Sequence, residues 1–220
     1  MAHGPKRATA LDPGAFIRRN LSLAPVPGLA EIRLYAAHPA SGLGRLGGGA
    51  PYWAYPWGGG LALAHFLAER PETVAGRRVL DFGSGSGLVA IAAAKAGATS
   101  VDAADTDRFA RTATALNAEA NGVTVAIHGR LGDPPPVDVV LAGDVFYSAA
   151  VARRSLAFLD RCLANGMAVL VGDPGRKYLP RARLRPLAEY DIADFGEARD
   201  THATKGMIFA LDRETLQAGA

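Results

Sequence analysis

The 220-residue chain has a single cysteine, Cys162, so it has no internal disulfide, and this scarcity is typical of proteins from reducing compartments. It also lacks an apolar run of the roughly 20 residues that a membrane-spanning helix needs. The apolar segment 89–98 is too short and carries Lys95. The formal net charge is only +3, which argues against nucleic acid as the main partner. With 49% apolar residues, the composition instead predicts one globular domain with a sizeable core.

Residues 1–20 contain several basic residues and one acid, a composition that transit peptides share. Pro5, Pro13 and Gly14 interrupt any amphipathic helix there, so we favour a solvated N-terminus. Further on, residues 41–51 predict a flexible glycine-rich loop, 51–57 are aromatic and rich in proline, and 59–70 predict a helix. We therefore divide the chain into an N-terminal extension with the flexible loop, 1–50, and one folded domain, 51–220.

Short apolar runs alternate with helical patterns from residue 77 onward. The predicted strands are 77–82, 99–105, 123–128, 137–144 and 167–173. The predicted helices between them are 87–97, 107–122 and 148–166. This alternation indicates a parallel sheet with helices on both faces and right-handed crossovers.

Two further strands are predicted at 188–196 and 204–212. Only a short link without a helix joins them, so they must be antiparallel. The predicted fold class is therefore α/β, a Rossmann-like seven-stranded sheet that is mostly parallel and ends in an antiparallel C-terminal hairpin.

The segment "DFGSGSG", 81–87, joins a predicted strand to a predicted helix. Helix N-termini offer unpaired N–H groups to an anionic group, and glycines let a ligand touch the backbone. No lysine follows Gly87, which excludes a triphosphate loop, and the dinucleotide fingerprint would need glycine at Leu88. No tyrosine has a lysine four residues later, and too little chain remains for a second dehydrogenase domain. A nicotinamide enzyme is therefore disfavoured.

The spacing D-x-G-x-G-x-G, followed by an acid at the end of the next strand, is the pattern of S-adenosylmethionine (SAM) methyltransferases. The first acid is Asp81, below the loop. The second is Asp105, about twenty residues past the glycines, where a carboxylate accepts protons from both ribose hydroxyls. A compatible alternative makes Asp105 the N-cap of a helix that starts at Asp107.

Four stretches together resemble one family: "PYWAYPWGGGLALAHFL", "GRRVLDFGSGSGLVAIAAAKAGA", "AGDVFY" and "GDPGRKYLP". They are similar to the lysine methyltransferases of the electron transfer flavoprotein β subunit and their bacterial homologues, from about Pro51 to Leu211. The glycine motif is shared by many methyltransferases, whereas "GDVFY" combined with W-x-x-x-W upstream is more specific. The chain departs from the family pattern at three positions near the expected substrate mouth. Pro56 precedes the second tryptophan, and Gly58 and Leu61 stand where proline and glutamine are usual.

The resemblance implies that 51–220 is a SAM-dependent methyltransferase domain, with S-adenosylhomocysteine as product. The expected substrate is a lysine of the electron transfer flavoprotein β subunit, with a ribosomal protein as a further candidate, in the cytoplasm of a bacterium or the mitochondrial matrix of a eukaryote. Neither a nucleic acid nor a membrane is expected as partner, and the oligomeric state is not predicted. Two alternatives stay open, a small-amine N-methyltransferase and a non-catalytic SAM-binding subunit. The predicted cofactor contacts are Trp53, Trp57, Asp81, Gly83, Ser84, Gly85, Gly87, Asp105, Thr106 and Gly143.

Methyl transfer from a sulfonium is an in-line displacement that needs no metal, and the five histidines are scattered without ligand spacing. Orientation therefore supplies most of the acceleration. A lysine acceptor arrives protonated, with a reference pKa near 10.4. Asp144 is expected to hold and aim it, as a positioning group, because a nearby carboxylate also favours the ammonium form. The alternative is that Asp144 caps a helix near Ser148. Tyr147 either bonds the amine, closes the channel or packs as a plain aromatic.

Three further features have two interpretations each. Trp53, Tyr55 and Trp57 either wall the methyl site, since aromatic faces favour cations, or plug the sheet. His128 ends the third predicted strand near the expected adenine edge, and we favour a solvated polar residue there. The basic cluster 176–186 either attracts an acidic protein surface or is a solvated face.

Overall fold

A computed structural model of the chain describes residues 11–46, 50–193 and 203–213. Its main sheet has seven strands in the order β5-β4-β3-β6-β7-β9-β8. Strands β3 to β7 pair in parallel, and β9 lies antiparallel to both β7 and β8. The predicted fold class is confirmed. The strands are β3 (Arg78–Phe82), β4 (Ser100–Ala104), β5 (Ala126–His128), β6 (Val139–Gly143), β7 (Ala168–Asp173), β8 (Leu184–Ala193) and β9 (Ala203–Leu211).

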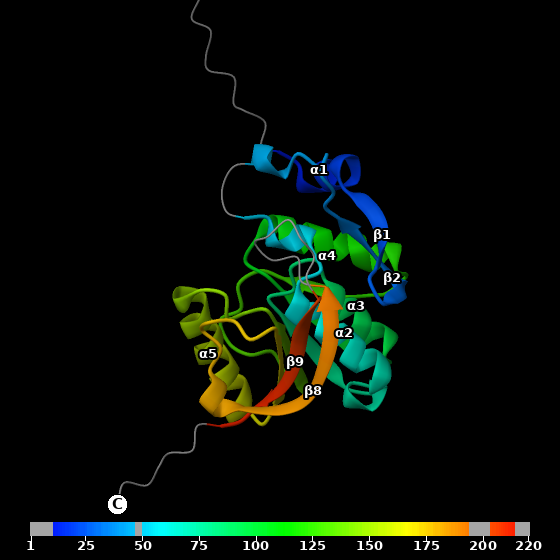
Figure 1. The fold of residues 1–220 in the computed structure, drawn as a ribbon. Coiled ribbons are helices and arrows are strands. Elements are labelled where there is room, and N and C mark those ends of the chain that lie inside the picture. Colours follow the sequence, from blue (N-terminus) through cyan, green and yellow to red (C-terminus); the bar gives the residue numbers. More distant parts are fainter. Residues whose placement is uncertain (1–10, 47–49, 194–202, 214–220) are drawn as a thin grey trace, which may run out of the picture.

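Helices cover both faces of this sheet, as the periodicity predicts. Helices α2 (Gly58–Glu69) and α3 (Leu88–Lys95) lie on one face and α5 (Ala149–Ala164) on the other (Figure 1). The central strands are buried on both sides, which is why β6 reads as a continuous apolar run. Among the described residues, no helix is both long and apolar enough to span a bilayer.

An N-terminal unit that the sequence analysis did not predict packs beside α4 (Arg108–Ala120) (Figure 1). It consists of α1 (Pro13–Asn20) and an antiparallel hairpin of β1 (Ser22–Val26) and β2 (Leu29–Ala36). We expected Pro13 to interrupt a helix, and this prediction is wrong. Pro13 is the first residue of α1, because proline is favoured in the first turn of a helix. Ile17 is fully buried, so this part of the N-terminus is not merely a solvated extension.

Side-chain amides of α4 attach this hairpin to the sheet domain. Asn121 accepts a hydrogen bond from the Arg33 backbone N–H at 2.9 Å and donates to the Arg33 carbonyl at 2.6 Å. Asn117, which is fully buried, accepts from the Tyr35 N–H at 2.8 Å and donates to the Ser86 carbonyl at 2.8 Å. Asn117 therefore connects β2 directly to the glycine loop.

Glycines allow the backbone of α2 to contact the backbone at the carboxyl ends of β6 and β7. A Cβ on Gly59 would collide with the Gly172 carbonyl, and one on Gly143 would lie 2.9 Å from the Gly60 Cα. Gly59 and Gly143 therefore have a packing role. Leu61, where the family usually has glutamine, is 1% exposed and belongs to the core, not to the substrate mouth.

The structure differs from the predicted elements by more than two residues at three places. Residues 43–46 of the expected flexible loop form a short 3-10 helix, and 47–49 lie outside the described residues. Strand β5 has three residues where six were expected. Strand β8 begins at Leu184, four residues early, because an edge strand tolerates Pro186 at a bulge; the predicted residues 194–196 lie outside the described part.

Candidate active site

A cavity of about 940 Å³ opens at the carboxyl ends of β3, β4 and β6. The strand order reverses between β3 and β6, since the chain adds β4 and β5 on one side of β3 and then places β6 on its other side. Ligands of open α/β sheets usually bind at such a switch point. The volume lies within the usual range for small-molecule sites. Nine of the twelve predicted site residues line it: Trp53, Trp57, Gly83, Gly85, Asp105, Thr106, Gly143, Asp144 and Tyr147.

The glycine loop wraps around Asp105. Gly83 and Gly85 both have left-handed φ angles, of 80° and 51°, which disfavour other residues. The Gly85 N–H donates to Asp105 Oδ2 at 3.0 Å, and the Asp107 N–H donates to Oδ1 at 2.9 Å. Burial raises the pKa of Asp105 above its usual value, while these two N–H donors lower it. Asp107, not Asp105, caps α4, through its hydrogen bond from Phe109.

Three predicted cofactor residues lie outside the large cavity. Asp81 and Ser84 line a smaller adjoining space of about 50 Å³ that shares Gly83 and Gly85 with it. Asp81 accepts the Ala90 N–H at 3.0 Å, and its burial raises its pKa to about 7. The Ser84 hydroxyl lies 3.2 Å from that of Thr114, so its side chain bonds to α4.

Gly87 lines neither cavity, and its assignment as a cofactor contact stays a prediction. It is the N-cap of α3 with φ of 80°, and a Cβ there would lie 2.8 Å from Thr114 Cγ2. Its glycine is required by a left-handed backbone and by close packing on α4.

Asp144 also lines the large cavity, and both of its carboxylate oxygens accept hydrogen bonds. Oδ2 accepts the Gly60 N–H at 2.9 Å, and Oδ1 accepts Arg176 Nη2 at 2.6 Å and Nε at 3.1 Å. Burial raises the pKa of Asp144 to about 6, against the opposing effect of Arg176. Ser148 is the N-cap of α5, so the alternative role of Asp144 as that cap is wrong.

Sequence analysis did not single out Arg176 as a site residue, although it lines the cavity. Asp173 positions it by accepting the N–H groups of Gly175 and Arg176 at 2.7 and 2.6 Å. The guanidinium also lies over the Trp57 ring, 5.8 Å from its centroid. The "GDPGR" segment that carries the family resemblance therefore builds a turn that pairs Arg176 with Asp144.

Aromatic rings surround the Asp144 end of the cavity. Tyr52 lies 5.0 Å from Tyr147 and 5.5 Å from Trp57 between ring centroids, and the Trp57 Nε1–H donates to the Tyr52 carbonyl at 2.6 Å. Tyr52 and Tyr147 are 45% and 43% exposed, so they form an open rim. Trp53 is 2% exposed and stacks on Phe109, so it fills the core and lines the cavity at once.

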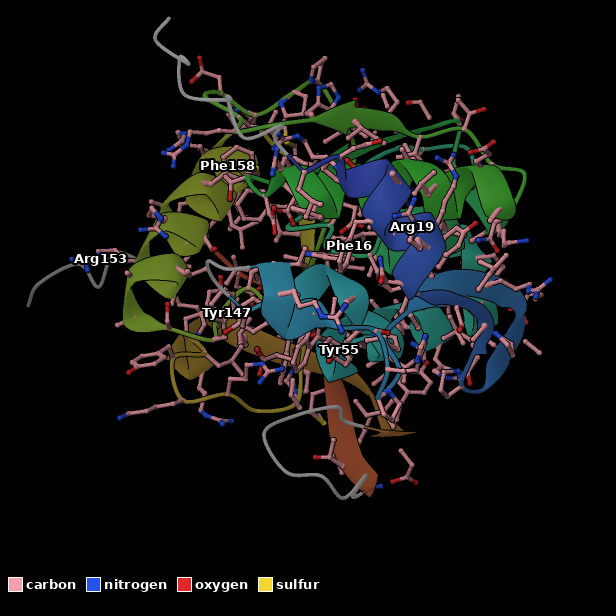
Figure 2. All side chains as sticks on the ribbon, turned by 90° about the horizontal axis from the view of Figure 1, so that it is seen from above. Phe16, Arg19, Tyr55, Tyr147, Arg153 and Phe158 are labelled. Atoms are coloured by element: carbon pink, nitrogen blue, oxygen red, sulfur yellow. The ribbon has the colours of Figure 1, made fainter. Side chains whose placement is uncertain are left out.

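The remaining cavity wall comes from the first turns after β5 and from α5. Phe158, in the second half of α5, stacks on Phe82 at 4.5 Å between centroids, and Tyr147 lies just before the start of that helix (Figure 2). His128, which ends β5, bonds through Nε2 to Asp102 at 2.6 Å and does not line the cavity. From the sequence we considered a contact with adenine or a solvated polar residue, and we did not predict the pairing of His128 with Asp102.

The residues present fit SAM. Asp105 offers carboxylate oxygens to ribose hydroxyls, the glycine loop leads into the α3 N-terminus, which suits the amino-acid carboxylate, and aromatic rings adjoin the place where a sulfonium belongs. The cofactor roles of individual residues stay predictions. No group of three or more His, Cys, Asp or Glu side chains in the described ranges is arranged to hold a metal.

Comparisons with known proteins agree with this site. A family model for ribosomal protein L11 methyltransferase (PrmA) matches residues 65–144. The electron transfer flavoprotein beta subunit lysine methyltransferase of Xenopus laevis is 35% identical over 94% of this chain and 90% of its own length. That of Danio rerio is 40% identical over 66% of this chain and 59% of its own length. A solved structure of a putative RNA methyltransferase from Pyrococcus horikoshii shares the fold, with a TM-score of 0.53 at 14% identity over 71% of this chain and 83% of that one.

Fold and site together define a SAM-dependent methyltransferase of the Rossmann-like class. Within that class, the chain belongs to the electron transfer flavoprotein beta subunit lysine methyltransferase family. The family assignment made from the quoted motifs is confirmed.

Proposed function

We propose that this protein methylates lysine side chains of the electron transfer flavoprotein β subunit. The names of its relatives support this substrate. The observation that carries the proposal is Asp144, a carboxylate only 12% exposed that lines the cavity together with the exposed rings of Tyr52 and Tyr147. An extended alkyl-ammonium chain entering the cavity beside this packed pair of rings would reach the carboxylate, and aromatic faces favour a cation.

SAM, when bound, supplies an electrophilic methyl group. The residues of this chain orient the acceptor and control its charge. Asp144 Oδ1 already accepts two N–H groups of Arg176, so an incoming ammonium must share or displace this pair. Asp144 is held at Oδ2 by the Gly60 N–H, which fixes its direction whichever cation it binds.

Arg176 changes the acid–base balance at the acceptor. Asp144 alone would favour the ammonium form of the lysine, which has no lone pair to attack a methyl group. A guanidinium beside the same carboxylate repels the ammonium and favours the neutral amine. The pair therefore aims the nitrogen while largely cancelling the charge that would keep it protonated. The proton leaves to water through the open rim.

We further propose that the enzyme works in the bacterial cytoplasm, or in the mitochondrial matrix if the source is a eukaryote, and that it acts on neither nucleic acid nor membranes. Its low cysteine content and small net charge support both statements.

The function is tested by incubating the purified enzyme with labelled SAM and the purified flavoprotein β subunit, with its lysines intact or replaced by arginine. A panel of small amines is assayed alongside. We expect label only on the lysine-containing protein. Label on the small amines and on no protein would overturn the lysine assignment and favour the small-amine alternative.

A further inference from the structure

Only part of the basic cluster 176–186 is available as the charged docking surface that the sequence suggested as one of its two roles. Arg176 pairs with Asp144, and its side chain is only 22% exposed. Arg183 is 14% exposed and bonds to Asp160 and to the Asp212 carbonyl. Arg181 donates to the Gly175 carbonyl at 2.8 Å. These arginines fasten the segment after β7 to the rest of the domain.

A second group of arginines lies on the outer face of α5. Arg153, Arg154 and Arg161 are exposed, and the exposed positions between and beside them are alanines. Within the part of the chain that the structure describes, Arg153 and Arg154 have no ion-pair partner. Arg161 bonds to the Ala157 and Gly132 carbonyls, so its charge is not neutralised.

This basic face of α5 borders the cavity. Arg154 and Arg161 line it, together with Arg130 from the loop after β5. Tyr147 immediately precedes the N-cap of α5, so the first turns of the helix adjoin the aromatic rim. Arg153 points away from the molecule (Figure 2). A partner whose lysine enters the cavity beside the tyrosines would therefore lie over these side chains.

The cofactor does not account for this charge. SAM has no phosphate, and its single carboxylate belongs at the N-terminus of α3, on the glycine-loop side of the cavity. Arg130, Arg153, Arg154 and Arg161 form no ion pair within the described ranges. Several such arginines at a cavity mouth attract an anionic surface and speed its approach.

We propose that the α5 arginines, Arg153 and Arg154 first, dock an acidic surface of the protein substrate beside its target lysine. The inference rests on the proposed function, because a lysine acceptor requires a protein partner at this mouth. Such docking would also make the enzyme selective among exposed lysines. The same arginines attract a lysine that lies beside acidic residues and repel one in lysine-rich surroundings.

Two measurements test this. The first is binding of fluorescent poly-glutamate to the enzyme without SAM, with poly-lysine and poly-uridylate as comparison polymers. The second is the KM for the purified flavoprotein β subunit, with the SAM dissociation constant measured separately. The variants are Arg153→Glu and Arg153→Glu/Arg154→Glu. The matched control is Arg19→Glu, an exposed arginine at the end of α1, on another part of the surface (Figure 2).

We expect poly-glutamate binding that weakens with salt and falls in both variants but not in the control. KM should rise roughly three- to tenfold in Arg153→Glu, with an unchanged SAM dissociation constant. Unchanged KM and unchanged poly-glutamate binding in the double variant would overturn the docking surface, even if the flavoprotein is methylated. Binding of poly-uridylate without poly-glutamate would also overturn it, in favour of RNA. If the flavoprotein is not methylated at all, the proposed function fails, and the poly-glutamate measurement still decides the docking surface.

Discussion

Replacing Asp144 by asparagine isolates the charge of the carboxylate at the acceptor end of the cavity. Asp144 has φ of 55°, a left-handed conformation that asparagine tolerates better than most residues. The amide oxygen can still accept the Gly60 N–H, so the attachment to α2 survives. What disappears is the negative charge 2.6 Å from Arg176 Nη2.

The size of the effect follows from the burial of the pair. Breaking a fully buried ion pair costs about 3–5 kcal/mol. Arg176 is 22% exposed and retains Trp57 beneath its guanidinium, so we expect a smaller loss of unfolding free energy, about 1–3 kcal/mol. SAM affinity should stay near normal, since the predicted ribose contact is Asp105, whose hydrogen bonds do not involve Asp144. Turnover should fall by roughly tenfold or more, equivalent to about 1.4 kcal/mol in the barrier.

The assay combines kcat on the flavoprotein β subunit, SAM binding by calorimetry and denaturant unfolding. Asp160→Asn is a matched control, because it breaks another aspartate–arginine pair, with Arg183, outside the cavity. That control should leave kcat unchanged and cost less than about 1 kcal/mol of stability. Full turnover in Asp144→Asn would remove Asp144 from the mechanism, and a strong loss of SAM binding would place its role in the cofactor site instead.

Three further predictions concern the cofactor side. Asp105→Ala should lose on the order of 1–3 kcal/mol of SAM binding free energy, measured by calorimetry. The fold should be retained, because Asp107 is the residue that caps α4. Unchanged SAM affinity would mean that Asp105 only holds the glycine loop. Asn117→Leu leaves the Tyr35 N–H and Ser86 carbonyl unpaired, so urea unfolding should show a loss of at least about 1–3 kcal/mol, and a stable variant would contradict the bridging role. Asp81→Asn should alter pH dependence. The folded-state pKa of Asp81 is raised to about 7, so its stabilising contribution is complete below pH 4 and is lost as pH rises through about 7. Between pH 4 and 8 the wild type should lose on the order of a few kcal/mol that the variant retains, and parallel stability curves would refute the raised pKa.

The sequence predicted the sheet domain well because its signals are local. Each apolar strand, each helix and the glycine loop is encoded by a few consecutive residues. The glycine loop and Asp105 also line the cavity that the structure shows. The N-terminal hairpin was missed because Pro25, Pro27 and Gly28 hide its alternating pattern, and because its stability depends on α4, far along the chain.

Contacts between distant segments were the other limit of the sequence. Arg176 and Asp144 are 32 residues apart, and nothing in either segment alone indicates that they pair. The same holds for Arg183 and Asp160, whose pairing removes an arginine from the expected docking surface. The DVFY and GDPGR segments were both noted as motifs, and their joint role becomes visible only when β6 and β7 lie side by side.

Mass spectrometry of the purified flavoprotein β subunit tests the central claim most directly. The protein is incubated with SAM and either wild-type enzyme or Asp144→Asn, and its peptides are then mapped. We predict methyl groups on lysine side chains only, accumulating with the wild type and at least roughly tenfold more slowly with the variant. Methyl groups on another residue type, or an unmodified protein in a preparation that methylates small amines, would contradict the account.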